Sequence, residues 1–183
     1  MSGIDILLED HRQIRRLGHV ILQCHKQLEA GHDIPIDDME LISSIIDDFL
    51  DSIHYSREED SYFPCVASYN TLNSDIRKLL IEHEFSRRVS RQISRHLAAW
   101  REGHDSREPV GRYMKTYWIY LNDHMDKEEK FFEEAQRQHI SREEGLEMSA
   151  QFQTTKAAIQ LDRILDDISY LEGCSWCKEY PKK

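Results

Sequence analysis

The stretch HYSREE at residues 54–59 decides the fold, because the chain repeats it as HMDKEE at residues 124–129. In each copy a histidine is followed four residues later by a glutamate. A lone histidine lies upstream of each copy, His11 before the first and His83 before the second, so the two halves are offset by about 70 residues. Chance rarely repeats four imidazoles and two carboxylates in one order. The repeat therefore predicts a dinuclear metal site between two similar helical hairpins.

The composition predicts an all-α protein. The chain has 183 residues, enough for one domain with a sizeable core, and 32% of them are charged. Only 7 glycines and 4 prolines interrupt a sequence rich in good helix formers.

Charge, hydropathy and cysteine content exclude several classes of protein. The net charge of -10 argues against a nucleic-acid partner, because phosphate binding needs a basic surface. No apolar run approaches the roughly 20 residues that span a bilayer, and the N-terminus does not have the pattern of a signal peptide. Four cysteines are too few for a disulfide scaffold, so the expected compartment is the cytoplasm.

Helical periodicity and capping signals predict five helices. They cover residues 4–30, residue 37 towards Pro64, and residues 73–100, 106–138 and 141–173. Short loops imply antiparallel neighbours, so we expect an up-down-up-down four-helix bundle with an additional C-terminal helix. We expect the bundle to occupy residues 1–140, and the helix with its CxxC tail to occupy residues 141–183.

The helix lengths allow a test of the metal site. In each hairpin the two histidines lie nearly the same number of residues from the connecting loop. At about 1.5 Å per residue, both therefore reach the same level of the bundle within about one turn. In each H-x-x-x-E pair the two side chains also share one helix face.

The predicted ligands are four histidines and two glutamates: His11, His54, Glu58, His83, His124 and Glu128. We assign the two histidines of each hairpin to one metal ion, and both glutamates to positions that bridge the ions. Mixed imidazole and carboxylate ligands suit iron, with manganese as the alternative. Such a centre, bridged also by an oxo, hydroxo or water ligand, would keep positions open for a small diatomic or peroxide ligand.

These residues resemble the hemerythrin-like, or HHE cation-binding, family over about residues 4–138. The resemblance implies a four-helix bundle with a non-haem di-iron centre that meets oxygen or related small molecules. Oxygen-carrying members usually place a fifth histidine one turn along the third helix, where this chain has Arg87 after His83 and Leu79 before it. The departure favours the members associated with sensing, iron and oxidant handling, or nitrosative-stress repair.

Several functions fit this pattern. The first is a protein that binds or senses oxygen, nitric oxide or a related oxidant at a centre of four histidines and two glutamates. The alternative is a di-iron enzyme of oxidative or nitrosative-stress defence, which consumes peroxide or nitric oxide or supplies iron for iron–sulfur cluster repair. Iron buffering is a third hypothesis. The sequence does not decide whether the protein is an enzyme.

Three further features have two interpretations each. Tyr120, one turn before His124, either directs its hydroxyl to a metal-bound oxygen species or is a core tyrosine with another partner. Cys174 and Cys177 form either a reduced, inert pair or a thiol–disulfide switch. The C-terminal helix either covers one face of the bundle or forms a homodimer with a second copy.

Overall fold

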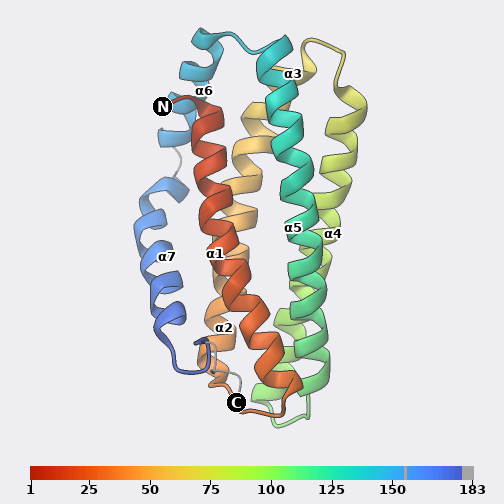
Figure 1. The fold of residues 1–183 in the computed structure, drawn as a ribbon, viewed down its shortest axis with the longest axis vertical. Helices are drawn as coiled ribbons and strands as arrows, with labels where there is room; N and C mark the ends of the chain where they lie inside the picture. The colour runs from red at the N-terminus through yellow and green to blue at the C-terminus, as the bar shows by residue number, and fades with distance from the viewer. Residues whose placement is uncertain (155, 179–183) are drawn as a thin grey trace.

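The computed structural model describes residues 1–154 and 156–178, and within these residues every regular element is helical. Figure 1 shows long helices that run antiparallel to one another along the whole length of the molecule. In chain order they are α1 (Gly3–Glu29), a second long helix built from α2 (Ile36–Ile45), η1 (Ile46–Tyr55), η2 (Glu58–Tyr62) and α3 (Phe63–Ala67), then α4 (Asn73–Arg101) and α5 (Arg107–Gln138). The predicted all-α, up-down-up-down bundle is confirmed.

Both ends of α1 are capped. At the start, the Ser2 hydroxyl accepts a hydrogen bond from the Asp5 amide, and the Asp5 carboxylate accepts one from the Ser2 amide. At the other end, Gly31 has a φ of +80°, which a residue with a side chain rarely adopts. The amide of His32 then donates back to the carbonyl of Gln27, and this bond closes the helix.

The second long helix differs from the regular helix that the sequence predicts. It continues past Pro64 to Ala67, and two of its segments, η1 and η2, have the wider turns of a π-helix. Pro64 has no N–H to donate to the preceding turn, and η2 lies directly before it. Such wide turns are common at functional sites.

Two apolar clusters form the core, and they meet different turns of the same helices. On α1, Leu7 belongs to one cluster and Ile14 to the other. On α4, Leu79 belongs to the cluster of Leu7, and Val89 belongs to the cluster of Ile14. A layer of buried polar side chains, which includes His11, separates the two apolar regions.

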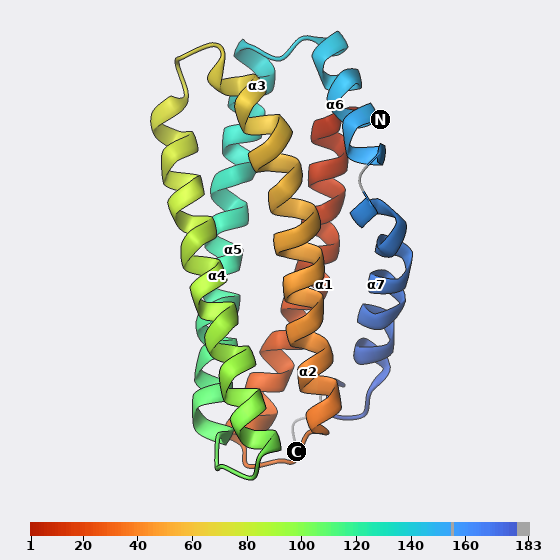
Figure 2. The ribbon, with the colours of Figure 1, turned by 180° about the vertical axis from the view of Figure 1, so that it is seen from behind.

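The predicted C-terminal helix is described on either side of residue 155, as α6 (Arg142–Thr154) and α7 (Lys156–Gly173). Both lie along α1 and the second long helix, as Figures 1 and 2 show. Phe152 of α6 is buried in the cluster around Leu7, and Ile168 of α7 is buried in the cluster around Ile14. This segment therefore covers one face of the bundle. Residues 155 and 179–183 of the predicted C-terminal unit lie outside the described residues.

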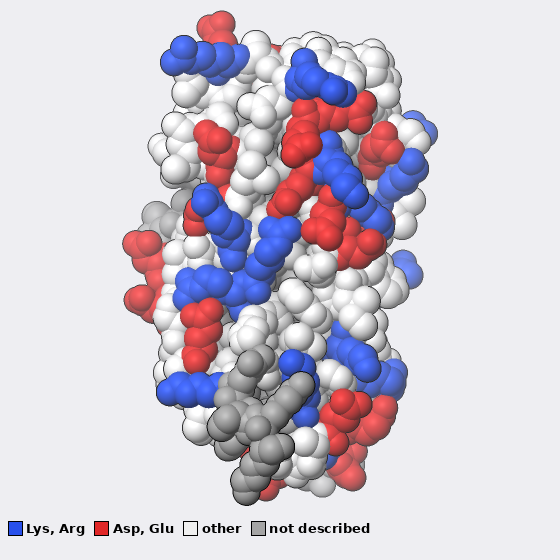
Figure 3. All heavy atoms as spheres, in the orientation of Figure 1, with Lys and Arg blue, Asp and Glu red and all other residues white. Residues whose placement is uncertain are grey.

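None of the described helices has a stretch long and apolar enough to cross a membrane. On the face drawn in Figure 3, which α1, α5 and α7 form, acidic and basic side chains are interspersed.

Candidate metal centre

The structure brings the six predicted ligands together between the two apolar clusters. We call them the six-residue cluster, and each member is at most 1% exposed. His11 comes from α1, His54 from η1, Glu58 from η2, His83 from α4, and the remaining two residues from α5. The last pair is His124 and Glu128.

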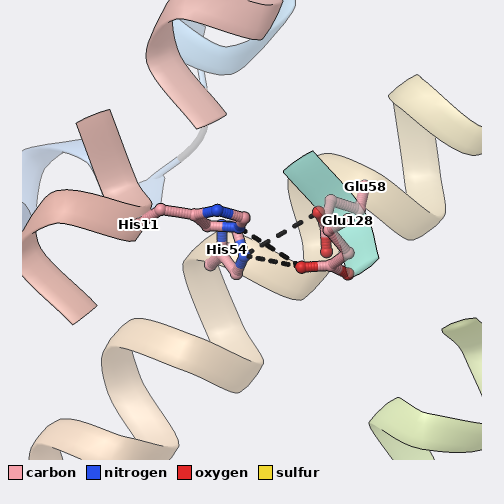
Figure 4. Close-up of side chains that lie close together, drawn as sticks. All are labelled: His11, His54, Glu58 and Glu128. Carbon is pink, nitrogen blue, oxygen red and sulfur yellow. Dashed lines mark ion pairs between the residues drawn. The ribbon is translucent and has the colours of Figure 1, made fainter. Parts of the chain in front are cut away.

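The first half of the cluster contains the histidines of the first hairpin. The Nε2 atom of His11 lies 3.2 Å from Oε2 of Glu128, and Nε2 of His54 lies 3.7 Å from Oε1 of Glu58. Figure 4 shows both imidazole rings directed at the two carboxylates. These four residues can offer one ligand atom each, all within 4.8 Å of one another.

The second half contains the histidines of the second hairpin. The Nε2 atom of His83 lies 3.3 Å from Oε2 of Glu58 and 3.2 Å from Oε1 of Glu128. The Nε2 atom of His124 lies 2.8 Å from the same Glu128 oxygen. Each glutamate therefore approaches histidines of both hairpins, which is the arrangement that two bridging carboxylates require.

Several buried atoms of the cluster satisfy no hydrogen bond among the described residues. They are both carboxylate oxygens of Glu58, Oε2 of Glu128, and the Nε2 atoms of His11 and His124. Some lie close to an opposite charge, as His11 and Glu128 do, but without the angles of a hydrogen bond. Burying such atoms without partners destabilises a fold. Cations between the histidines and the glutamates would give these atoms partners, so the residues fit a metal pair.

The pKa shifts within the cluster also fit a metal pair. Burial lowers the pKa of His54, but the charges of Glu58, Asp10 and Glu128 outweigh it and raise that pKa to about 10. For Glu128, burial raises the pKa, and the histidines around it lower it to well below the usual range. Protons thus hold the metal-free cluster together, and metal ions would replace them.

The other ring nitrogen of each histidine, Nδ1, meets a carboxylate behind the cluster. The pairs are His11 with Glu129 at 3.1 Å, His54 with Asp10 at 3.4 Å, His83 with Glu59 at 2.6 Å and His124 with Glu82 at 2.8 Å. A carboxylate at this position fixes the tautomer and turns Nε2 towards a metal.

Each of these four carboxylates is in turn held by a cation. The pairs are Glu129 with Arg15, Asp10 with Arg57, Glu59 with Arg87 and Glu82 with Lys127, at distances of 2.6 to 3.0 Å. The whole arrangement repeats between the hairpins, because Asp10 and Glu82 each precede a lone histidine and Glu59 and Glu129 each follow a glutamate of the cluster. The repeat also contains these acids and cations, but the sequence prediction named only the six ligands.

The chain matches a protein-family model over most of its length. The model of the Hemerythrin HHE cation binding domain matches residues 2–135. The chain belongs to the hemerythrin family. Comparison with curated proteins and with solved structures found no match. Family membership and the buried histidine–glutamate cluster together indicate a metal-binding helical protein.

The hydroxyl of Tyr120 in this hemerythrin-family bundle is buried and has no hydrogen-bond partner among the described residues. Its direction towards a metal-bound oxygen species therefore stays a prediction. Its ring lies parallel to that of His124 at 6.1 Å and contacts Phe85 at 4.5 Å. Another tyrosine, Tyr55, stacks on His83 at 3.8 Å and donates its hydroxyl to Ser86. Sequence reasoning missed Tyr55 because it follows a ligand directly.

The two flanks of the hemerythrin-family site differ. On the first hairpin, Phe152 of α6 covers Arg57 at 5.7 Å and closes the flank. The corresponding place on the second hairpin is a hollow of about 470 Å³ between α4 and α5. Leu79 and Phe131 form its apolar lining, and Glu82, which holds His124, forms part of its wall.

The cysteines lie away from the six-residue cluster, and all four are free thiols. Burial raises the pKa of the Cys177 thiol to about 11, with a further contribution from Cys174. Burial and Asp38 raise the pKa of Cys174 as well. Raised pKa values make thiols slow nucleophiles, which favours the reduced, inert pair, and the switch stays a prediction.

Proposed function

We propose that the six-residue cluster binds two iron ions and that the loaded centre binds or senses oxygen, nitric oxide or a related oxidant. The histidines of each hairpin would hold one ion, and Glu58 and Glu128 would bridge the pair together with an oxo, hydroxo or water ligand. Manganese is the alternative metal. Iron would supply redox chemistry and open coordination positions for a small diatomic or peroxide ligand.

One observation carries this proposal: buried glutamate oxygens without hydrogen-bond partners face the Nε2 atoms of four histidines. Glu128 is shared between the two groups that can hold a metal. Neutral imidazoles and carboxylates together suit iron better than copper or a closed zinc site.

The chain's own residues would orient and shield the bound ions. The carboxylates at Nδ1 keep each imidazole turned inward, and the apolar clusters on both sides exclude bulk water. A small molecule would approach from the hollow between α4 and α5, past Leu79 and Phe131, because α6 closes the other flank.

An enzyme that consumes peroxide or nitric oxide, or supplies iron for cluster repair, is the second candidate. The observation that favours it is that Arg87 occupies the position where a fifth histidine would lie. Its guanidinium binds Asp51 and Glu59 and offers no ligand atom to a metal. With fewer protein ligands, the metal ions would keep more coordination positions open for a substrate. Iron buffering without turnover is the third candidate.

Metal analysis and stopped-flow spectroscopy test these proposals in order. Two irons per chain support the di-iron centre, whereas one metal per chain, or zinc alone after growth in iron-rich medium, contradicts it. The anaerobically reduced protein is then mixed with oxygen, nitric oxide or hydrogen peroxide. A stable, reversible adduct indicates binding or sensing, rapid repeated turnover indicates an enzyme, and oxidation with release of iron indicates buffering.

The compartment and the oligomeric state are proposals as well. Four free thiols fit the reducing cytoplasm. A homodimer through the C-terminal helices would use their outer side, where Leu146 and Tyr170 are exposed, because Ile164, Ile168 and Leu171 already pack inside the chain. Light scattering at several concentrations measures whether such a dimer forms.

A further inference from the structure

Tyr120 connects the six-residue cluster to the surface. Its ring lies parallel to His124, with the planes 8° apart and the centroids 6.1 Å apart. On its other side it contacts the ring of Phe85, 4.5 Å away. Phe85 is 43% exposed, so a short series of rings in contact leads from a proposed iron ligand to solvent.

The surface around Phe85 is apolar. Ile81, one turn earlier on α4, is 69% exposed. The two side chains line a shallow hollow together with Leu80, Glu84 and Arg88. Exposed apolar side chains grouped in this way are typical of surfaces that bind another protein.

The charge of α4 contrasts with that of the whole chain. Within Asn73–Arg101 there are seven basic and three acidic residues, although the chain has a net charge of -10. Arg77, Arg88 and Arg95 are exposed on this helix and make no ion pair within the part of the chain that the structure describes. Unpaired guanidiniums beside an apolar hollow attract an acidic partner.

We propose that this α4 surface docks an acidic one-electron carrier protein, which delivers electrons to the iron centre across Phe85 and Tyr120. In each encounter the reduced carrier loses one electron, and one ferric ion of the centre becomes ferrous. No bond forms or breaks, and a second encounter reduces the second ion. The inference rests on the proposed function for its electron acceptor, whereas the docking surface exists without the metal.

The surface fits such a carrier better than other occupants. Redox partners form small, transient interfaces, for which one apolar patch with a charged rim is sufficient. A nucleic-acid duplex would meet the same guanidiniums, but its phosphate backbone would leave the apolar side chains of Ile81 and Phe85 uncovered.

Stopped-flow mixing of the ferric protein with a reduced plant-type [2Fe–2S] ferredoxin tests the route. The second-order rate constant should fall as salt is added. The charge-reversal variant Arg88→Glu/Arg95→Glu should lower this rate constant about tenfold at low salt, because the variant loses the electrostatic attraction that guides the carrier to α4. The matched control Lys26→Glu/Arg163→Glu makes the same change in net charge on α1 and α7 and should have a much smaller effect. Equal effects of the two variants would overturn the proposal.

Variants of the rings test the path itself. Phe85→Ala should slow electron transfer from ferredoxin several-fold and leave reduction by dithionite unchanged. Tyr120→Phe should keep the rate, because ring contact and not the hydroxyl is required. A full rate in Phe85→Ala would contradict the path.

Binding to the metal-free protein separates this inference from the proposed function. Oxidised ferredoxin is titrated into the isotope-labelled, metal-free chain, and amide chemical shifts are followed. Shifts centred on α4, weakened at least tenfold by Arg88→Glu/Arg95→Glu, support docking even if iron is not the metal. Failure to bind, or shifts centred on another face, overturns docking, whereas a loaded protein that dithionite cannot reduce overturns only the proposed function.

Discussion

At the scale of single residues, each histidine of the cluster uses its two ring nitrogens for different tasks. Nε2 faces the glutamates, and Nδ1 meets a carboxylate that a cation holds in place. For His83 the carboxylate is Glu59, and the cation is Arg87. The carboxylate sets the tautomer, so the metal affinity of the site depends on residues that would never touch a metal.

Glu59→Gln should lower metal affinity about tenfold, because the amide still accepts the Nδ1 hydrogen bond but no longer supplies a negative charge. Glu129→Gln, its counterpart in the repeat, should have a similar effect. Competition with a chelator measures both. Glu9→Gln is the control, because Glu9 contacts exposed Arg12 and the Gln13 amide but no histidine of the cluster, and should leave affinity unchanged. Equal affinities in all three variants would show that the outer carboxylates have no such role.

Gly18 should tolerate no side chain. A Cβ atom placed there would lie 1.9 Å from the Trp118 ring, which crosses α1 at this point. Gly18→Ala should therefore lower the free energy of unfolding by about 1–3 kcal/mol as the indole is displaced. Gly173→Ala, where a Cβ meets nothing within 4 Å, is the control and should be nearly neutral. Urea unfolding compares the two, and an unaffected Gly18→Ala would contradict the close packing.

At the scale of elements, the sequence predicted the helices and which six residues lie together, but not every turn. The repeat predicted which residues meet, because residue type, order and hairpin register all agreed. The wide turns of η1 and η2 were not predicted, since apolar periodicity hardly differs between one regular turn and a wider one.

The covering helix α6 should stabilise the flank of the first hairpin. Phe152→Ala removes a buried ring that packs near Leu7 and lies over Arg57, and should cost about 3–5 kcal/mol of unfolding free energy. Leu146→Ala on the same helix should change stability by less than about 0.5 kcal/mol, because Leu146 is 51% exposed. Thermal unfolding measures both variants. Equal and small losses would mean that α6 contributes little to the bundle.

At the scale of the whole molecule, the centre ties four helices together at the one level where the core is polar. Without metal, the raised pKa values of His54, His83 and His124 and the lowered pKa of Glu128 favour charged pairs in this layer. With metal, the same side chains would be bound as neutral imidazoles and carboxylates. The stability of the bundle and its metal affinity are therefore coupled through protons.

The coupling predicts opposite effects of pH on the two forms. The pKa of His54 is about 10 in the folded, metal-free protein and 6.5 in an unstructured chain, so its charge contributes stability that is fully present below about pH 6.5. That contribution should be lost as the pH rises through 10, and the melting temperature of the metal-free protein should fall over this range. Metal binding displaces the same protons, so affinity should rise with pH and loading should acidify a weakly buffered solution. Calorimetry at pH 7 and pH 9 measures both the melting temperature of the metal-free protein, which should fall, and the metal affinity, which should rise. A metal-free protein whose melting temperature rises towards pH 9 would show that its histidines are already neutral and that the cluster is held together in another way.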